Sequence, residues 1–160
     1  MSDWPAPSLL DRLTDNDRAV TRESEAAGQL SSHRMRDYLK RDISNLLATI
    51  RLEDITDLSA YPNIRTSVLN YGIGDISGMP EKNVRALELE AMVRDALRAF
   101  EPRLSPGSVH VDVIEYKEGD MRGQAKMVID ASWTDGVVRE ALNLEARIDF
   151  SSGDISLQDA

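Results

Sequence analysis

The residues of this chain that come closest to a reactive arrangement are a glutamate and an arginine on either side of a proline, Glu101-Pro102-Arg103. Because the residue before a proline is disfavoured in the helical region, Glu101 is expected at or near the end of a helix, with Arg103 just beyond it. The fixed φ angle of Pro102 holds the carboxylate and the guanidinium close together, so they can pair with each other or with other groups nearby. The simplest interpretation is a helix stop with a surface ion pair, which contributes about 0 to 1 kcal/mol.

A second chemistry open to Glu101 is acid catalysis. Glycoside hydrolases use two carboxyl groups, and Glu101 beside an apolar helix end could act as the general acid if Asp112 or Asp135 supplied the second carboxylate about 5 to 10 Å away. Arg103 argues against this hypothesis, because a neighbouring cation favours the ionised form of Glu101. The two Trp, four Tyr and two Phe of the chain also leave few platforms for sugar rings.

Other reactive arrangements have little support in the sequence. The chain has no cysteine, and its two histidines, His33 and His110, lie far apart and outside any metal-ligand spacing. The segment Gly72-Ile73-Gly74-Asp75 invites comparison with phosphate-binding loops, but it lacks a preceding strand, a third spaced glycine and a following Gly-Lys-Ser/Thr. We therefore expect no metal and no cofactor.

Composition limits the fold and the partners. A chain of 160 residues with 41% hydrophobic and 29% charged residues fits one soluble domain with a real core. No apolar run approaches the roughly 20 residues of a membrane span, and the first residues lack the order of a secretory signal, so a cytoplasmic location without membrane insertion is expected. A formal net charge of -9 argues against general nucleic-acid binding, because no basic surplus is available to displace counterions.

Residues 1–30 are predicted to be an N-terminal extension, and residues 31–160 a single domain. Within the extension, Leu9, Leu10 and Leu13 share one face of a short helical stretch. Residues 14–28 are polar and have almost no large apolar side chain to bury, which is typical of a flexible linker. The leucines are expected either to dock on their own domain or to enter a groove on a partner, unless the terminus is simply frayed in solvent.

Two long helices are predicted from apolar residues at helical spacing. The first begins near Ser32, and the second runs from Glu81, after Pro80, to Phe100. On the first helix, Arg34, Arg36, Asp37, Lys40, Arg41 and Asp42 are expected on the face opposite the apolar stripe. The predicted apolar faces are formed by Met35, Tyr38, Leu39, Ile43, Leu46 and Leu47, and by Val84, Leu87, Leu89, Met92, Val93, Ala96, Leu97 and Phe100.

The segment between these helices, residues 54–78, is predicted to be a structured loop. Tyr61-Pro62 favours an extended or turned step, and Ile64, Val68 and Leu69 are expected to form a short helix. Asn70-Tyr71-Gly72 then supplies residues that tolerate the left-handed conformation at a helix end.

The C-terminal third alternates apolar and polar residues as β-strands do. Short connections favour an antiparallel arrangement, and the predicted fold is α+β, with the two helices on one face of a mainly antiparallel sheet of three to four strands. Such an open sheet leaves at least one edge whose N–H and C=O groups need a partner. The predicted strands contain Val109, Val111 and Val113; Ala125, Met127 and Ile129; Leu142, Leu144, Ala146, Ile148 and Phe150; and Ile155-Ser156-Leu157.

An ordered set of short motifs extends over most of the chain up to residue 104. The motifs are Pro7-Ser8-Leu9-Leu10-Asp11-Arg12-Leu13, Arg41-Asp42-Ile43-Ser44-Asn45-Leu46-Leu47, Asp57-Leu58-Ser59-Ala60-Tyr61-Pro62, Ser67-Val68-Leu69-Asn70-Tyr71-Gly72, Asp75-Ile76-Ser77-Gly78 and Glu101-Pro102-Arg103-Leu104. This set resembles the TssE family of baseplate subunits of type VI secretion systems, which are related to the lysozyme-like wedge proteins of contractile phage baseplates. Beyond residue 104 the resemblance rests on the strand pattern alone.

The resemblance implies a structural, non-enzymatic role. It implies a fold shared with the interlocking domain of contractile sheath subunits, in which strands from neighbouring chains complete one another's sheets. A chain of this family is expected to join the wedge to the first sheath ring and to template sheath polymerisation by strand addition. The implied partners are the wedge proteins TssF and TssG, the sheath proteins TssB-TssC and, indirectly, the baseplate protein TssK. The implied location is the cytoplasmic baseplate docked at the inner membrane.

The resemblance also implies roles for particular residues. Glu101, Pro102 and Arg103 would lie in the core of the interlocking region, with the charge pair as a clamp whose partners are intrachain or interchain. If the pair is buried at an interface, loss of one partner costs about 3 to 5 kcal/mol. Alanine at Glu101 or Arg103 is expected to leave the monomer folded and to block sheath assembly. Leu9, Leu10 and Leu13 would anchor the chain on the wedge. Independently of the resemblance, the residue types of Tyr61, Pro62, Asn70, Tyr71 and Gly72 predict that they shape the structural loop.

Two alternatives stay open at the level of sequence. One is the glycoside hydrolase acting on peptidoglycan, because related proteins carry lysozyme in their family label. The other is an adaptor that uses its edge strand for a different partner.

Overall fold

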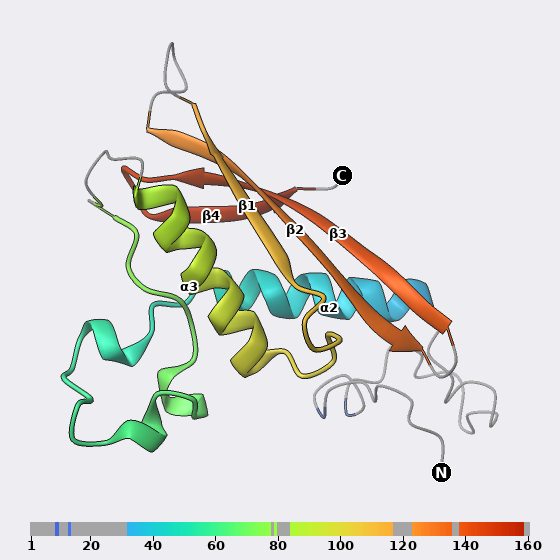
Figure 1. Ribbon diagram of the computed structural model, residues 1–160, viewed down its shortest axis with the longest axis horizontal. Helices are drawn as coiled ribbons and strands as arrows, with labels where there is room; N and C mark the ends of the chain where they lie inside the picture. Colours follow the sequence, from blue (N-terminus) through green and yellow to red (C-terminus); the bar gives the residue numbers. More distant parts are fainter. Residues whose placement is uncertain are drawn as a thin grey trace.

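The computed structural model describes residues 9, 13, 32–77, 79, 84–116, 123–135 and 138–158. Two long helices precede a β-meander, and three short 3-10 helices lie in the connection between the long helices (Figure 1). In chain order the elements are α2 (Ser32–Leu47), η2 (Leu52–Asp54), η3 (Pro62–Ile64), η4 (Val68–Asn70), α3 (Val84–Phe100), β1 (His110–Glu115), β2 (Gln124–Asp135), β3 (Val138–Asp149) and β4 (Asp154–Gln158).

The four strands form one antiparallel sheet in the order β1-β2-β3-β4. Strands β2 and β3 are twelve residues long and pair over their whole length, from Gln124 opposite Asp149 to Asp135 opposite Val138. The α+β class and the antiparallel sheet predicted from the alternating pattern are therefore confirmed.

The core lies between one face of this sheet and both helices. Helix α3 packs on β1, whereas α2 contacts β3, β4 and α3. Every second strand residue points into this layer, which is why the strands alternate between buried and exposed side chains along their length. The strand residues buried here are Val111, Val113, Ala125, Met127, Ile129, Ala131, Trp133, Leu142, Leu144, Ala146 and Ile148.

The helix predictions are largely right, with two corrections. Leu87 was expected on the apolar face of α3, but its side chain is 66% exposed, because that face is broader than its contact with the sheet. Asp42 was expected on the solvated face of α2, but its side chain is only 24% exposed and pairs with Arg103, which follows α3. The stretch 81–83, where α3 was expected to begin, lies outside the described residues.

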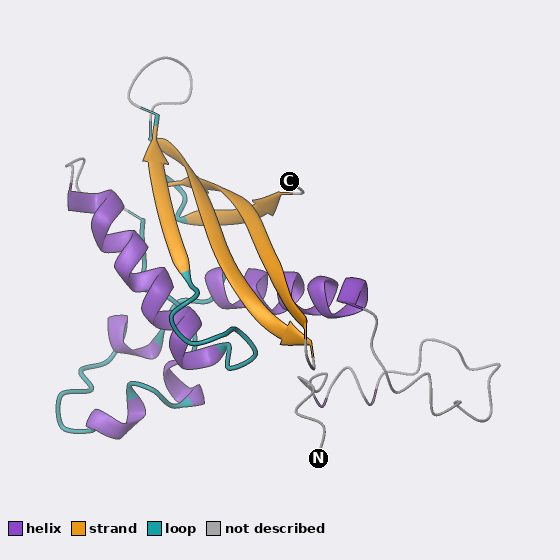
Figure 2. Ribbon diagram, turned by 45° about the vertical axis from the view of Figure 1, so that its right-hand side comes forward, coloured by secondary structure: helices purple, strands orange, loops and turns teal. Residues whose placement is uncertain are grey.

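The connection between the helices differs from its prediction. Ile64, Val68 and Leu69 do not form one short helix; they fall in two separate 3-10 turns, η3 and η4. Val68 and Leu69 are 82% and 65% exposed, so neither side chain contributes to the core. In both ribbon views this connection extends away from the sheet (Figures 1 and 2).

The paired strands β2 and β3 extend beyond both of their neighbours (Figure 1). On the β2 side, β1 pairs only as far as Asp130, and the following part of β2 is covered by residues 104–108: Ser105 N donates to Ser132 O at 2.7 Å, and Leu104 forms a bridge with Trp133. On the β3 side, β4 pairs only as far as Glu145. Within the described part of the chain, residues 139–144 of β3 have no strand partner on that side.

Among the described residues, no helix combines the length and the apolar character that crossing a membrane would require.

Candidate assembly site

The corner at Glu101-Pro102-Arg103 connects the end of α3 to the sheet. Glu101 N still donates to Leu97 O at 2.9 Å, which makes Glu101 the last residue with a helical hydrogen bond. Pro102 ends the helix as the sequence predicts, and Leu104 N donates to Glu101 O at 3.2 Å to close the turn. The chain then enters the sheet at the bridge between Leu104 and Trp133.

Glu101 and Arg103 form a two-pronged ion pair within the chain. Arg103 Nε lies 2.6 Å from Glu101 Oε1, and Arg103 Nη2 lies 2.5 Å from Glu101 Oε2. The Arg103 backbone N–H also donates to Glu101 Oε1 at 3.3 Å. The side chains of Glu101 and Arg103 are only 5% and 14% exposed. The pair is therefore largely buried, and the interpretation as an ordinary surface ion pair is wrong.

A third member of the site, Asp42, comes from the other helix. Arg103 Nη2 lies 2.7 Å from Asp42 Oδ2, so one guanidinium connects α2 to the end of α3 across 61 residues of sequence. Asp42 also pairs with Arg41 on the outer side. Sequence reasoning missed this contact; the available signal was the position of Asp42 directly before the buried Ile43, at the border of the apolar stripe.

The charges of the site shift the pKa values of Arg103 and Tyr71. Burial by itself lowers the pKa of Arg103, but the hydrogen bonds and charges of Glu101, and then those of Asp42, outweigh it and raise that pKa above its ordinary value. The guanidinium thus stays charged. Tyr71 lies nearby: burial, followed by the charges of Asp42 and Glu101, raises the pKa of its hydroxyl, although the charge of Arg103 opposes the shift.

Tyr71 ties the connection between the helices to the charged corner. Its ring packs edge-on against Phe100, the last residue of α3, with a centroid distance of 5.4 Å and an interplanar angle of 66°. Its hydroxyl donates to Asp42 O at 3.4 Å. The three segments that meet at the corner are therefore α2, the connection and the end of α3.

The other predicted loop residues have different tasks. Asn70 does not adopt a left-handed conformation; its buried amide instead accepts from Glu53 N at 2.9 Å and donates to Arg65 O at 3.0 Å. Gly72 has φ +122°, and a Cβ there would lie 2.3 Å from Thr49 O. Tyr61 is exposed, and Pro62 begins η3, where its missing N–H costs nothing.

Of the three leucines of the expected partner anchor, the structure describes two. Leu9 and Leu13 are 71% and 74% exposed, and Leu10 is outside the described part of the chain.

Glu101 and Asp112, two residues of the hydrolase hypothesis, do not form a catalytic arrangement. Arg103 occupies both carboxylate oxygens of Glu101, and Asp112 is exposed on β1, whose alternate residues face the core. The side chain of Asp135 is outside the described residues. The part of the chain that is described contains no group of three or more His, Cys, Asp or Glu side chains that could hold a metal ion.

One further buried charge escaped the sequence analysis. Arg85 on α3 is 6% exposed; its guanidinium lies over the ring of Phe150 at 3.7 Å and donates to Met79 O at 3.3 Å. It joins the start of α3 to the end of β3 by a cation–π contact.

Comparison with known proteins gives a family. No curated protein matches the sequence. A chain of a solved structure, described as "The baseplate complex from the type VI secretion system", is similar to it, with 16% sequence identity, a TM-score of 0.47 and coverage of 72% of this chain and 94% of that chain. The family model described as "Baseplate wedge protein gp25" matches residues 33–135, which is more than half of the chain. The wedge family expected from the ordered motifs is thereby confirmed, and the chain belongs to the baseplate wedge protein gp25 family.

Proposed function

We propose that this chain is a structural subunit of a type VI secretion baseplate that joins the wedge to the first sheath ring and templates sheath polymerisation by strand addition. Membership of the baseplate wedge family and the ordered motifs shared with TssE support the baseplate role. The observation that carries the strand-addition step is the open edge of β3 beyond the end of β4.

The geometry of this edge suits an incoming strand. Asn143 O accepts a hydrogen bond from Arg36 Nη2 at 3.5 Å on this side, so Asn143 turns its backbone groups away from β2. By strand alternation, Arg139 and Ala141 also present their N–H and C=O groups on the same side. Within the described residues, the long Arg36 contact is the only hydrogen bond to the outward-facing backbone groups of this stretch. A strand placed here would continue the row of β4 and gain main-chain hydrogen bonds.

The Glu101-Pro102-Arg103 corner would fix the position of the helices that pack next to this edge of β3. Glu101, Arg103 and Asp42 fix α2 against the end of α3, and α2 supplies Arg36 to the edge. Arg103 Nη1 is buried without a hydrogen-bond acceptor among the described residues. In this proposal the Glu101-Pro102-Arg103 corner is the clamp of the interlocking region.

The proposed partners are TssF and TssG in the wedge and TssB-TssC in the sheath, with TssK contacted indirectly. Leu9, Leu10 and Leu13 would anchor the chain on the wedge, at a baseplate on the cytoplasmic side of the inner membrane. The proposed role is structural and requires no catalytic residue or cofactor.

The test is a proline at the open edge. In Ala141→Pro the lost N–H points away from β2, so the β2–β3 ladder keeps its hydrogen bonds while strand addition is blocked. Ala141→Val, which keeps the N–H, is the matched control. We expect purified Ala141→Pro protein to bind TssF-TssG normally and to fail to start TssB-TssC sheaths, counted by electron microscopy. Sheath formation at the wild-type level with Ala141→Pro would contradict the proposed edge.

A further inference from the structure

Exposed apolar side chains gather on the connection between α2 and α3. Of the nine large apolar side chains exposed in the described residues, five lie between Ile50 and Leu69. We use the term connecting-loop surface for Ile55, Tyr61, Val68 and Leu69, which are 74%, 61%, 82% and 65% exposed. They lie on or beside η2, η3 and η4, and η4 contacts both other turns. Exposed apolar side chains that form a patch are typical of protein-interaction surfaces, and the contacts among the three turns bring their segments together.

The connection that carries this surface is braced by its own polar contacts. Asn70 links Glu53 to Arg65 through both ends of its amide, and Arg65 Nε donates to Glu53 Oε1 at 2.7 Å. Arg51 Nε pairs with Asp54 Oδ1 at 2.7 Å. A loop held by its own side chains loses little conformational freedom on binding, which favours affinity.

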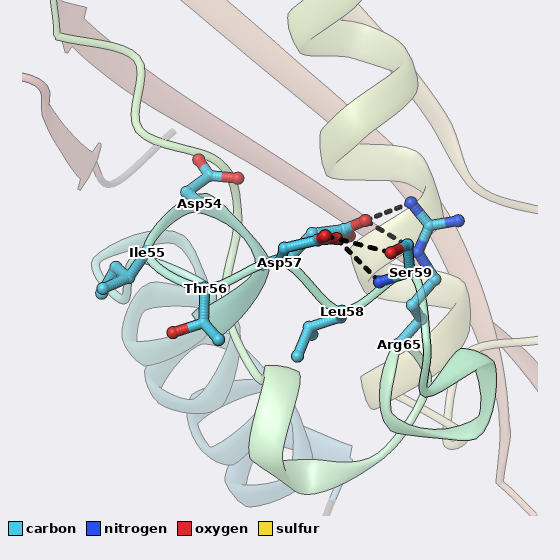
Figure 3. A pocket seen from close by; sticks show the side chains of 8 residues that line it. Asp54, Ile55, Thr56, Asp57, Leu58, Ser59 and Arg65 are labelled. Atoms are coloured by element: carbon cyan, nitrogen blue, oxygen red, sulfur yellow. Dashed lines mark hydrogen bonds and ion pairs between the residues drawn. The ribbon is translucent and has the colours of Figure 1, made fainter.

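An open pocket of about 610 Å³ adjoins the apolar side chains. Ile55 belongs to both, and the pocket is also lined by Glu53, Asp54, Asp57 and Arg65 (Figure 3). Two of its three carboxylates are already paired, Glu53 with Arg65 and Asp54 with Arg51, which is outside the pocket lining. Asp57 accepts hydrogen bonds from Ser59, which lower its pKa and keep it ionised, and it makes no ion pair within the described residues. The pocket therefore carries net negative charge next to apolar surface.

We propose that the connecting-loop surface docks an amphipathic segment of another polypeptide, one that places apolar side chains on Ile55, Val68 and Leu69 and a lysine or arginine in the adjoining acidic pocket. The negative charge of the pocket favours a segment that carries a lysine or an arginine. A nucleic acid or an anionic lipid surface would be repelled by the carboxylates, and so would the same acidic surface of a second copy. The proposal rests on the proposed function, in which the segment belongs to a wedge subunit.

The test measures binding of the full-length protein to purified TssF-TssG by isothermal titration calorimetry at low and at high ionic strength. The variants are Val68→Ser/Leu69→Ser for the apolar part and Asp57→Asn for the pocket. Leu87→Ser on α3 and Ile114→Ser on β1 are matched controls, because these large apolar side chains are 66% and 57% exposed and lie outside the connection. All the changes lie at exposed positions, and circular dichroism verifies that each variant folds.

We expect Val68→Ser/Leu69→Ser to weaken binding by about tenfold or more at both ionic strengths, since the lost contacts are apolar. Asp57→Asn should weaken binding at low ionic strength and have little effect at high ionic strength, where salt screens the charge. The controls should bind as the wild type does.

Three results would overturn the inference. If both loop variants bind TssF-TssG like the wild type, the docking surface is wrong while the proposed function stands. If the wild-type protein does not bind TssF-TssG, the proposed function fails and the inference fails with it. If sedimentation shows a wild-type dimer that Val68→Ser/Leu69→Ser dissociates, the occupant is a second copy.

Discussion

At the scale of single residues, the centre of this protein is a guanidinium shared by two carboxylates. Arg103 contacts both oxygens of Glu101 and one oxygen of Asp42. The two carboxylates differ in burial, because Glu101 is 5% exposed and Asp42 is 24% exposed with Arg41 as a second partner. Glu101 is thus the partner that the fold depends on most.

The first prediction compares the two carboxylates. Glu101→Gln should lower the free energy of unfolding by about 3 kcal/mol or more, because it leaves the buried Arg103 with a single, partly exposed counter-charge. Asp42→Asn should cost about 1 kcal/mol, since the bidentate pair with Glu101 remains. Urea denaturation followed by fluorescence gives both values. Equal losses for the two variants would contradict this ranking.

The sequence predicted one half of this charged site and not the other. Glu101 and Arg103 are neighbours along the chain, and Pro102 restricts the backbone between them, so their pairing is a local property. The contact of Arg103 with Asp42 depends on how α2 crosses the end of α3, which no local pattern contains. The same limit explains why Arg85, an arginine within an apolar helix, was not recognised as a buried partner of Phe150.

At the scale of elements, the connection between α2 and α3 is joined to the core by a close backbone approach. Ile73 N donates to Thr49 O at 2.9 Å, and Arg51 N donates to Ile73 O at 2.9 Å, so Ile50 and Ile73 form a parallel bridge. Gly72 makes this approach possible, because it has a positive φ and no side chain facing Thr49.

The second prediction separates the effect of the positive φ of Gly72 from the effect of its close approach to Thr49. Gly72→Ala should destabilise the fold by more than about 3 kcal/mol, since the new Cβ meets Thr49 O and the φ angle is strained as well. Gly107→Ala is the matched control: its φ is +76° and a Cβ would meet nothing within 4 Å, so only strain of about 1 kcal/mol is expected. The midpoints of urea denaturation measure the difference. Similar losses at both glycines would show that the close approach contributes nothing.

The elements themselves were well predicted where one face is buried. Alternation in β2 and β3 and the apolar stripe of α2 follow directly from the burial of a single face, so residue type reports position. The connection was harder to predict because its apolar residues Val68 and Leu69 point into solvent and break that rule. An exposed apolar pair has the same sequence signature as a buried one, and the pattern therefore predicts one short helix where the structure has two 3-10 turns.

At the scale of the whole molecule, the two edges of the sheet are treated differently. On the β1 edge, α3 packs alongside and Glu90 Oε1 accepts from Val113 N at 2.9 Å. A side chain that occupies an edge N–H in this way blocks the approach of another strand. On the opposite edge, β4 is short and β3 extends beyond it.

The third prediction tests the guarded edge. Glu90→Ala should leave the N–H of Val113 without an acceptor, so this amide should exchange its hydrogen faster. The exposed edge of β1 should then promote self-association. Glu88→Ala, an exposed glutamate on the same helix, is the control and should leave both properties unchanged. Hydrogen-exchange mass spectrometry and sedimentation velocity measure the two effects. Unchanged exchange in β1 of Glu90→Ala would show that the helix alone protects this edge.

The overhang of β3 has a consequence for how an array of such sheets could grow. A subunit that accepts a strand on one side and is shielded on the other behaves as a monofunctional initiator in a polymerisation. Under the strand addition proposed above, it would begin a row, would not be inserted into the middle of one, and would not extend a row made of its own copies. The direction of growth would then be set at the first addition, and the number of rows would equal the number of initiators present.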